Sequence, residues 1–93
     1  MIQIQVPEGA RIQSQTPSGE TLDRVRPGEC ARVRAIHGDS QFRRRLMEMG
    51  FVSGTHVRVV RLAPFGDPME VELYGYHISL RRSEARTILV GPC

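Results

Sequence analysis

The sequence predicts a small, mainly β domain: a barrel of about five short strands with one short α-helix and one helical turn. Three observations support this fold class. Apolar and polar residues alternate in several runs of about four to eight residues, the pattern of half-buried strands. Turns containing glycine or proline separate these runs at short intervals. A stretch near residue 45 instead has the apolar spacing of an amphipathic helix.

Three runs and one hairpin account for the five predicted strands. Ala31 and Val33 alternate with Arg32 and Arg34, and so place the two arginines on an outer face. A glycine at position 75 marks the turn of a hairpin. The predicted strands occupy residues 30–36, 55–62, the two arms of the hairpin at 69–82, and 87–90. A single helical turn at 83–85, capped by Ser83, precedes the last strand. An SH3-like barrel fits this count.

The helix is expected at about residues 40–49. Asp39 or Ser40 can cap its start, and Gly50 supplies the left-handed residue that ends it. Three apolar side chains spaced four and three residues apart should form one buried stripe: Phe42, Leu46 and Met49. Arg43 and Arg44 lie off this stripe and should be exposed. They form either a solvated helix face or a contact surface for an anion or an acidic partner.

Residues 1–20 differ from the domain at 21–93. The opening MIQIQV alternates like a half-buried strand, and the stretch QSQTPSGE that follows is typical of a polar linker. We expect this N-terminal extension to be an edge strand or a mobile tail. It lacks a basic leader and the chain has no apolar run of about 18 residues, so a cytoplasmic protein without membrane insertion is predicted.

Composition excludes several kinds of catalytic site. The 93 residues include thirteen basic residues, all of them arginine, and ten acidic ones, for a net charge of +3. Without lysine, neither a phosphate-binding loop of the usual kind nor Schiff-base catalysis is available. A chain of this length also builds only a small core. We therefore expect no enzyme activity and no catalytic residues.

The sequence shows no local spacing of metal ligands. His37, His56 and His77 lie far apart, and the two cysteines, Cys30 and Cys93, are too few for a disulfide scaffold. We expect two free thiols, no cofactor and no metal site.

An ordered set of short motifs resembles the FeoA family, small partners of the bacterial ferrous iron transporter FeoB. The motifs are Arg45-Leu46 with Met49-Gly50; Gly54-Thr55; Pro64 with Gly66-Asp67-Pro68; Leu80-Arg81 with Glu84-Ala85; and Ile88 with Val90. The similarity extends over about residues 21–90. It implies an SH3-like fold, a cytoplasmic location, no catalytic residues and a functional link to FeoB, whose cytoplasmic end carries a GTP-binding domain. Activator, assembly factor and GTPase-activating partner are all compatible with the resemblance.

Two functional hypotheses follow. The first is an adaptor that binds the cytoplasmic part of a FeoB-type transporter through two contact regions: Arg43 and Arg44 on the helix, and Tyr74 and Tyr76 at the hairpin tip. Arginine and tyrosine are enriched at protein interfaces. The alternative is a free-standing SH3-like module that binds a peptide or protein. Nucleic-acid binding is disfavoured, because few exposed aromatic residues are expected and two glutamates lead into the hairpin tip.

Overall fold

The computed structural model describes residues 20–93, so the predicted strand near the N-terminus lies outside the described residues. Six strands form one antiparallel sheet: β1 (Glu20–Thr21), β2 (Cys30–Ile36), β3 (His56–Leu62), β4 (Met69–Leu73), β5 (Tyr76–Leu80) and β6 (Ile88–Gly91). The helices are α1 (Ser40–Glu48), α2 (Arg82–Ala85) and a 3-10 turn, η3 (Leu22–Arg24). Within residues 20–93, none of the helices has the length and apolarity that a bilayer crossing requires.

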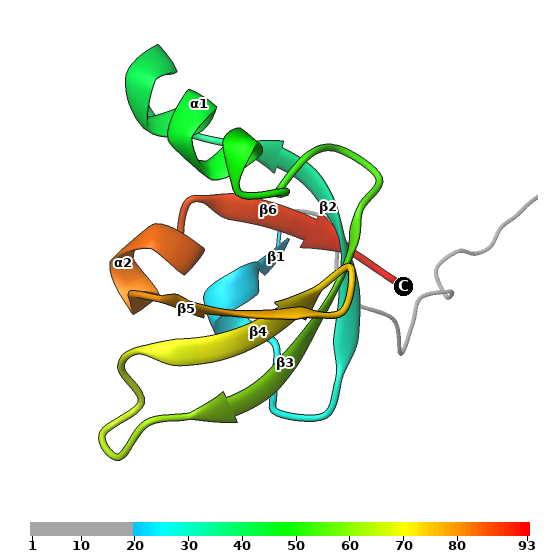
Figure 1. Cartoon of the computed structure of the whole chain (residues 1–93), viewed down its shortest axis with the longest axis vertical. Coiled ribbons are helices and arrows are strands. Elements are labelled where there is room, and N and C mark those ends of the chain that lie inside the picture. The colour runs from blue at the N-terminus through cyan, green and yellow to red at the C-terminus, as the bar shows by residue number, and fades with distance from the viewer. Residues whose placement is uncertain (1–19) are drawn as a thin grey trace, which may run out of the picture.

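The sheet follows the order β1-β6-β2-β3-β4-β5 and curls around the core (Figure 1). All five predicted strands are present, which confirms the mainly β class. The sixth strand, β1, escaped prediction because its two residues are too short to show alternation. β1 and β5 are the edges of the sheet and do not pair with each other, so the barrel is open.

The core lies inside the curled sheet and takes one side chain from nearly every second strand position. The strands from β2 to β6 contribute buried apolar residues, which in β4 are Met69, Val71 and Leu73, at alternate positions. The helix contributes Leu46 and the residue after its end contributes Phe51, both fully buried. The observed alternation therefore confirms the strand faces read from the sequence.

Helix α1 has the predicted limits but a narrower buried stripe. The Asp39 carboxylate accepts a hydrogen bond from the Phe42 amide at 2.8 Å, and Gly50 ends the helix with φ +116°. Of the predicted stripe, Leu46 is buried and Phe42 is half-buried, but Met49 is 38% exposed. The expectation for Met49 was wrong because this residue caps the helix at its C-terminal end, where the chain turns toward Phe51.

Helix α2 begins earlier than predicted. Its N-cap is Arg81, and Ser83 lies within the helix, so the predicted Ser83 cap was wrong. Two side chains replace that cap: the Glu84 carboxylate accepts from the Arg81 amide at 3.0 Å, and Asp67 accepts from the Arg82 amide at 3.0 Å. Asp67 belongs to a loop fifteen residues before Arg82, so the local sequence pattern did not indicate this cap.

Cys30 and Cys93 form a disulfide, so the prediction of two free thiols was wrong. The sheet register explains the pairing. Arg32 of β2 lies opposite Gly91 of β6, and two further residues along each antiparallel strand bring Cys30 opposite Cys93. Their Cα atoms are 5.8 Å apart, within the usual range for a disulfide. A separation of 63 residues in sequence hid this neighbourhood.

Candidate functional site

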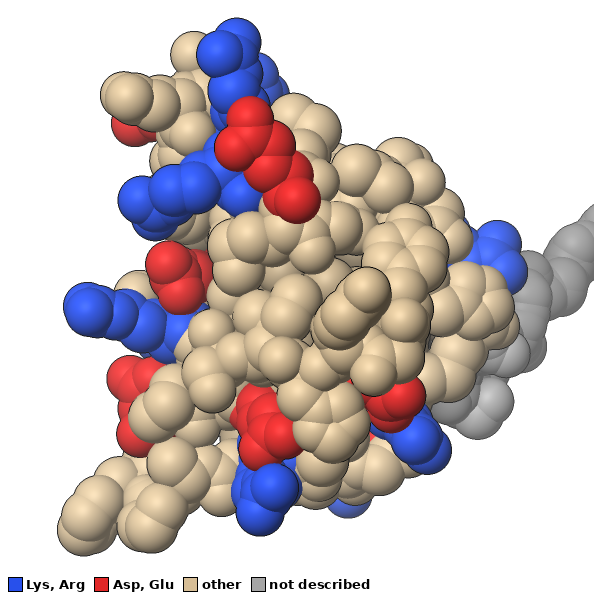
Figure 2. Space-filling view, in the orientation of Figure 1, with Lys and Arg blue, Asp and Glu red and all other residues tan. Residues whose placement is uncertain are grey.

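The three consecutive arginines of α1 have different environments. Arg43 and Arg44 are exposed, as predicted, and Figure 2 shows arginine side chains projecting around this helix. Arg45 instead contacts α2: its Nη2 atom lies 3.6 Å from Glu84 Oε2, and its guanidinium lies 5.8 Å from the centre of the Phe42 ring. Arg45 therefore helps position α1, while Arg43 and Arg44 remain available to a partner.

The β4–β5 hairpin presents the two predicted tyrosines. Leu73 pairs with Tyr76 across a two-residue turn whose residues, Tyr74 and Gly75, both have positive φ (51° and 82°). This is the backbone of a type I′ turn, which suits the twist of a hairpin. Tyr74 is 69% exposed and Tyr76 is 72% exposed. The structure confirms their exposure at the tip; their role in binding stays a prediction.

Tyr74 lies against the loop that follows α1. Its hydroxyl is 3.0 Å from Thr55 Oγ1. A Cβ atom placed on Gly50 would lie 3.4 Å from the Tyr74 ring, so the ring passes close to the glycine backbone. The hairpin tip and the C-terminal end of α1 are therefore in contact. The tip therefore packs against the end of the helix that carries Arg43 and Arg44.

Two shallow hollows flank Tyr74. One is lined by Val52, Ser53, Gly54, Thr55, His56 and Tyr74. The other is lined by Cys30, His56, Val57, Arg58, Glu72, Tyr74, Gly75 and Cys93. Both are open to solvent, and they share Tyr74 and His56. Open hollows of this kind accommodate a side chain of a partner protein better than they enclose a small substrate.

An uncharged area extends between α1 and the hairpin tip (Figure 2). Three apolar side chains that the sequence prediction did not assign to binding are exposed on α1 and the segment after it: Met47 (44%), Met49 (38%) and Val52 (39%). The signal for them was present, because the segment LMEMGFV holds more apolar residues than a nine-residue helix can bury on one face. Charged Arg43 and Arg44 therefore adjoin an apolar patch, a combination typical of protein interfaces.

Phe65 is a second apolar residue that the prediction missed. It is fully exposed in the loop between β3 and β4, with φ +75°. The sequence signal was the position of Phe65 between Pro64 and Gly66 in a turn, where a side chain has no strand face to occupy.

The acidic residues of β4 are neutralised by their neighbours. Glu70 accepts from Arg61 at 2.8 Å and contacts His77 at 2.7 Å, and Glu72 accepts from Arg58 at 3.1 Å. The hydrogen bond from Arg61, supported by the one from His77, lowers the pKa of the Glu70 carboxyl below its usual value. This perturbed acid belongs to an exposed ladder of ion pairs, so it does not indicate catalysis.

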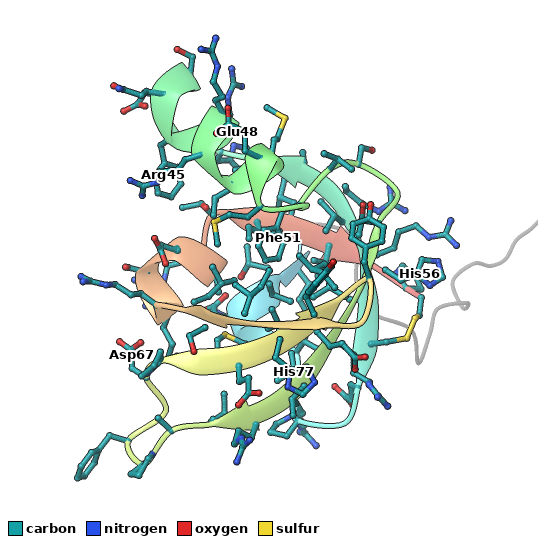
Figure 3. All side chains as sticks on the ribbon, in the orientation of Figure 1. Arg45, Glu48, Phe51, His56, Asp67 and His77 are labelled. Atoms are coloured by element: carbon teal, nitrogen blue, oxygen red, sulfur yellow. A yellow bond between two sulfur atoms is a disulfide. The ribbon has the colours of Figure 1, made fainter. Side chains whose placement is uncertain are left out.

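The three histidines considered as metal ligands do not come together in the structure. His56 Nε2 is 3.1 Å from Arg32 Nη2, whereas His77 pairs with Glu70 on a separate part of the sheet (Figure 3). His37 is exposed after β2. Within the part of the chain that the structure describes, in which Cys30 and Cys93 are bonded to each other, no group of three or more His, Cys, Asp and Glu side chains is arranged as a metal site.

Several motif residues support the fold. The Arg82 side chain donates to the carbonyl oxygens of Gly66 (3.4 Å) and Asp23 (2.8 Å). Together with the contact from Asp67 to the Arg82 amide, these bonds fasten α2 to the β3–β4 loop and to η3. The glycine and acidic residues of the motifs therefore determine where α2 lies.

Comparison with known proteins identifies the family. The FeoA domain matches residues 20–92. A fusion of Fe(2+) transport protein A with the Fe(2+) transporter FeoB from Porphyromonas gingivalis is 39% identical over 69 residues, which are 74% of this chain and 8% of that protein. This chain thus spans a small fraction of that fusion protein.

Solved structures agree with this assignment. The FeoA protein of Chlorobium tepidum has a TM-score of 0.73 and 38% identity, over 78% of this chain and 70% of that one. The FeoA of Stenotrophomonas maltophilia, a procaryotic SH3-domain protein whose structure contains zinc, has a TM-score of 0.67 and 35% identity, over 76% and 88% of the two chains. These similarities confirm the SH3-like fold.

Proposed function

The chain belongs to the FeoA family, and from this premise we propose that it is a non-catalytic cytoplasmic adaptor that binds the GTP-binding part of a FeoB-type ferrous iron transporter and regulates it. The observation that supports this most is the fusion relative, in which a similar domain and FeoB are parts of one chain. Covalent linkage keeps two partners at a high effective concentration. A separate adaptor must achieve the same association through its surface.

The surface around α1 and the hairpin tip fits this role. Arg43 and Arg44 supply exposed positive charge, which attracts an acidic partner and speeds association. Met47, Val52 and Tyr74 supply apolar area beside it. Methionine, tyrosine and arginine are the side chains that protein interfaces favour. We propose that the partner contacts both Arg43 and Arg44 and the tyrosines Tyr74 and Tyr76.

The geometry favours regulation without chemistry of its own. The hollows beside Tyr74 are open, and the acid with a lowered pKa, Glu70, is held by Arg61 and His77. General acid–base catalysis needs a group that is free to exchange a proton with a substrate. Neither hollow is lined by an acid and a histidine that contact each other.

A binding assay with the intact transporter tests the proposal. Purified FeoB-type transporter from the same genome is immobilised without nucleotide, with GDP and with a non-hydrolysable GTP analogue. Wild type should bind in at least one nucleotide state. The double variant Arg43→Glu/Arg44→Glu should bind roughly tenfold or more weakly, because two attractive charges become repulsive. Raising the salt concentration should weaken wild type more than the variant.

A matched control separates the helix face from overall charge. Arg24→Glu/Arg26→Glu makes the same change in net charge at exposed positions in and after η3 and should bind like wild type. Tyr76→Ser tests the hairpin tip, and Phe65→Ser removes a still more exposed aromatic side chain elsewhere. Equal binding by wild type and the α1 variant would eliminate the helix face. No binding by wild type in any nucleotide state would refute the adaptor function itself.

A further inference from the structure

One of the two hollows beside Tyr74 brings together side chains that bind soft metal ions. Both cysteines line it, together with His56 and Glu72. Figure 3 shows the His56 imidazole next to the disulfide. In the sequence, Cys30, His56 and Cys93 are far apart, which is why no ligand spacing was visible. The fold assembles them from the starts of β2 and β3 and from the segment after β6.

The strand register places Cys30 and His56 on one face of the sheet, and the disulfide holds Cys93 beside Cys30. Cys30 lies opposite Arg58, and Arg32 lies opposite His56, so Cys30 and His56 are diagonal neighbours on adjacent antiparallel strands. Such neighbours have Cα atoms about 7–8 Å apart, and their Cβ atoms are somewhat closer. The intervening residues Ala31 and Val57 point into the core, so the ligand side chains share the outer face. One cation can bridge a thiolate and an imidazole across this spacing.

We propose that, after reduction of the disulfide, the Cys30 and Cys93 thiolates and the His56 imidazole bind one thiophilic divalent cation of the Zn²⁺ type. Two sulfurs and one nitrogen are typical donors for such an ion, with a water completing the tetrahedron. Glu72 lines the same hollow, but its carboxylate is held by Arg58 at 3.1 Å, so we assign the fourth position to water. This proposal is independent of the adaptor function.

The His56 ring already presents the lone pair that a metal requires. Its Nε2 atom is 3.1 Å from Arg32 Nη2. A guanidinium can only donate hydrogen bonds, so His56 Nε2 is the acceptor in this contact. Metal binding exchanges the Arg32 donor for the cation at this atom. Arg32 is exposed and can move its guanidinium into solvent.

The redox step determines whether the site exists. A dithiol reductant delivers two electrons and two protons: the Cys30–Cys93 bond breaks, two thiols form, and the dithiol becomes a disulfide. The cation then displaces both thiol protons into solvent and binds two thiolates. In the oxidised state the two sulfurs are bonded to each other and are no longer thiolate ligands. Oxidation therefore excludes the metal, and reduction admits it.

Cobalt titration of the reduced protein tests this site. The full chain is reduced with dithiothreitol, desalted under anaerobic conditions and titrated with Co²⁺. We expect one Co²⁺ per chain, thiolate-to-cobalt charge-transfer absorption, visible bands of tetrahedral cobalt, and displacement by one equivalent of Zn²⁺. Titration of the reduced protein with Zn²⁺ should release about two protons per metal in a weakly buffered solution at a pH where the thiols are protonated. The oxidised protein should show none of these signals.

Variants identify the ligands. Cys93→Ser and His56→Ala should each weaken binding by roughly tenfold or more, since even residues behind the ligands change affinity by that factor. The matched control is His77→Ala, which removes an exposed histidine that pairs with Glu70 and lines neither hollow. Its affinity should equal that of wild type. Equal losses in His56→Ala and His77→Ala would overturn the assignment of His56.

Circular dichroism of the same samples shows whether the reduced protein is folded, and so separates loss of metal binding from loss of the fold. Reduced wild type that stays folded but gives no charge-transfer band at stoichiometric Co²⁺ refutes the site. If reduction unfolds the apoprotein, Zn²⁺ must restore the spectrum of wild type but not that of Cys93→Ser. Failure to restore it, or equal restoration of both proteins, also refutes the proposal. Binding of Co²⁺ to the oxidised protein with the same affinity would refute the redox dependence.

Discussion

Loss of the Cys30–Cys93 disulfide should lower the free energy of unfolding by about 4 kcal/mol. The bond joins residues 63 positions apart, and closing so long a loop removes much of the entropy of the unfolded chain. Domains of ordinary stability unfold at a cost of about 5–15 kcal/mol, so this contribution is a large part of the total. For a domain of this size, the melting temperature should fall by roughly 15–30 °C.

Urea unfolding measures this contribution directly. Wild type is compared with and without reductant, and Cys30→Ser and Cys93→Ser are measured under both conditions. Reduced wild type and the two variants should have similar midpoints, and reductant should leave the variants unchanged. A thiol assay on unfolded, unreduced protein should find no free thiol. Two free thiols in that assay, or one midpoint for reduced and oxidised wild type, would refute the reasoning.

Two further predictions concern the core and the ion pairs of β4. Leu46→Ala should destabilise the domain by about 2–5 kcal/mol, because Leu46 is fully buried. Met47→Ala, at an exposed neighbouring position, should change the free energy of unfolding by about 0.5 kcal/mol or less. The urea midpoints of both variants measure this difference. Glu70 has a lowered folded-state pKa, so its pairing with Arg61 and His77 stabilises the fold above the carboxyl's unfolded pKa and is lost as the pH falls through the folded one. The stability difference between wild type and Glu70→Gln should therefore shrink with acidification, and a difference independent of pH would contradict this account.

Local pattern predicted the strands because each strand has one buried face. Alternation in 30–36 and 69–73 fixed both position and orientation, and the glycine at 75 located the hairpin turn. Failures occurred where a distant residue determines the local structure. The N-terminal end of α2 depends on Asp67, fifteen residues earlier, so Ser83 was chosen as a cap for want of a visible alternative. The disulfide likewise depends on the register between β2 and β6.

The sequence predicted the part of the candidate site that depends on local pattern and missed the part that depends on the fold. Exposure of Arg43, Arg44, Tyr74 and Tyr76 follows from local position, since the arginines lie off the apolar stripe, Tyr74 lies in a tight turn and Tyr76 follows that turn. Among the apolar residues between them, Met49 was assigned to the core, because hydrophobic spacing alone does not show how much of α1 packs against the sheet. Only the fold shows that Met49 is exposed.

The family motifs and the proposed binding surface differ in what they do, and Gly50 is the residue that connects them. Arg45, Asp67 and Glu84 form contacts that hold α1, α2 and the β3–β4 loop together. Gly50 ends α1 at a positive φ, and its backbone lies against the Tyr74 ring, which would be 3.4 Å from an added Cβ atom. A side chain at this position would strain the backbone, while its Cβ atom would only reach ordinary van der Waals contact with Tyr74. The motif glycine therefore shapes the surface on which a partner is proposed to bind, while the side chains that are proposed to contact the partner lie largely outside the motifs.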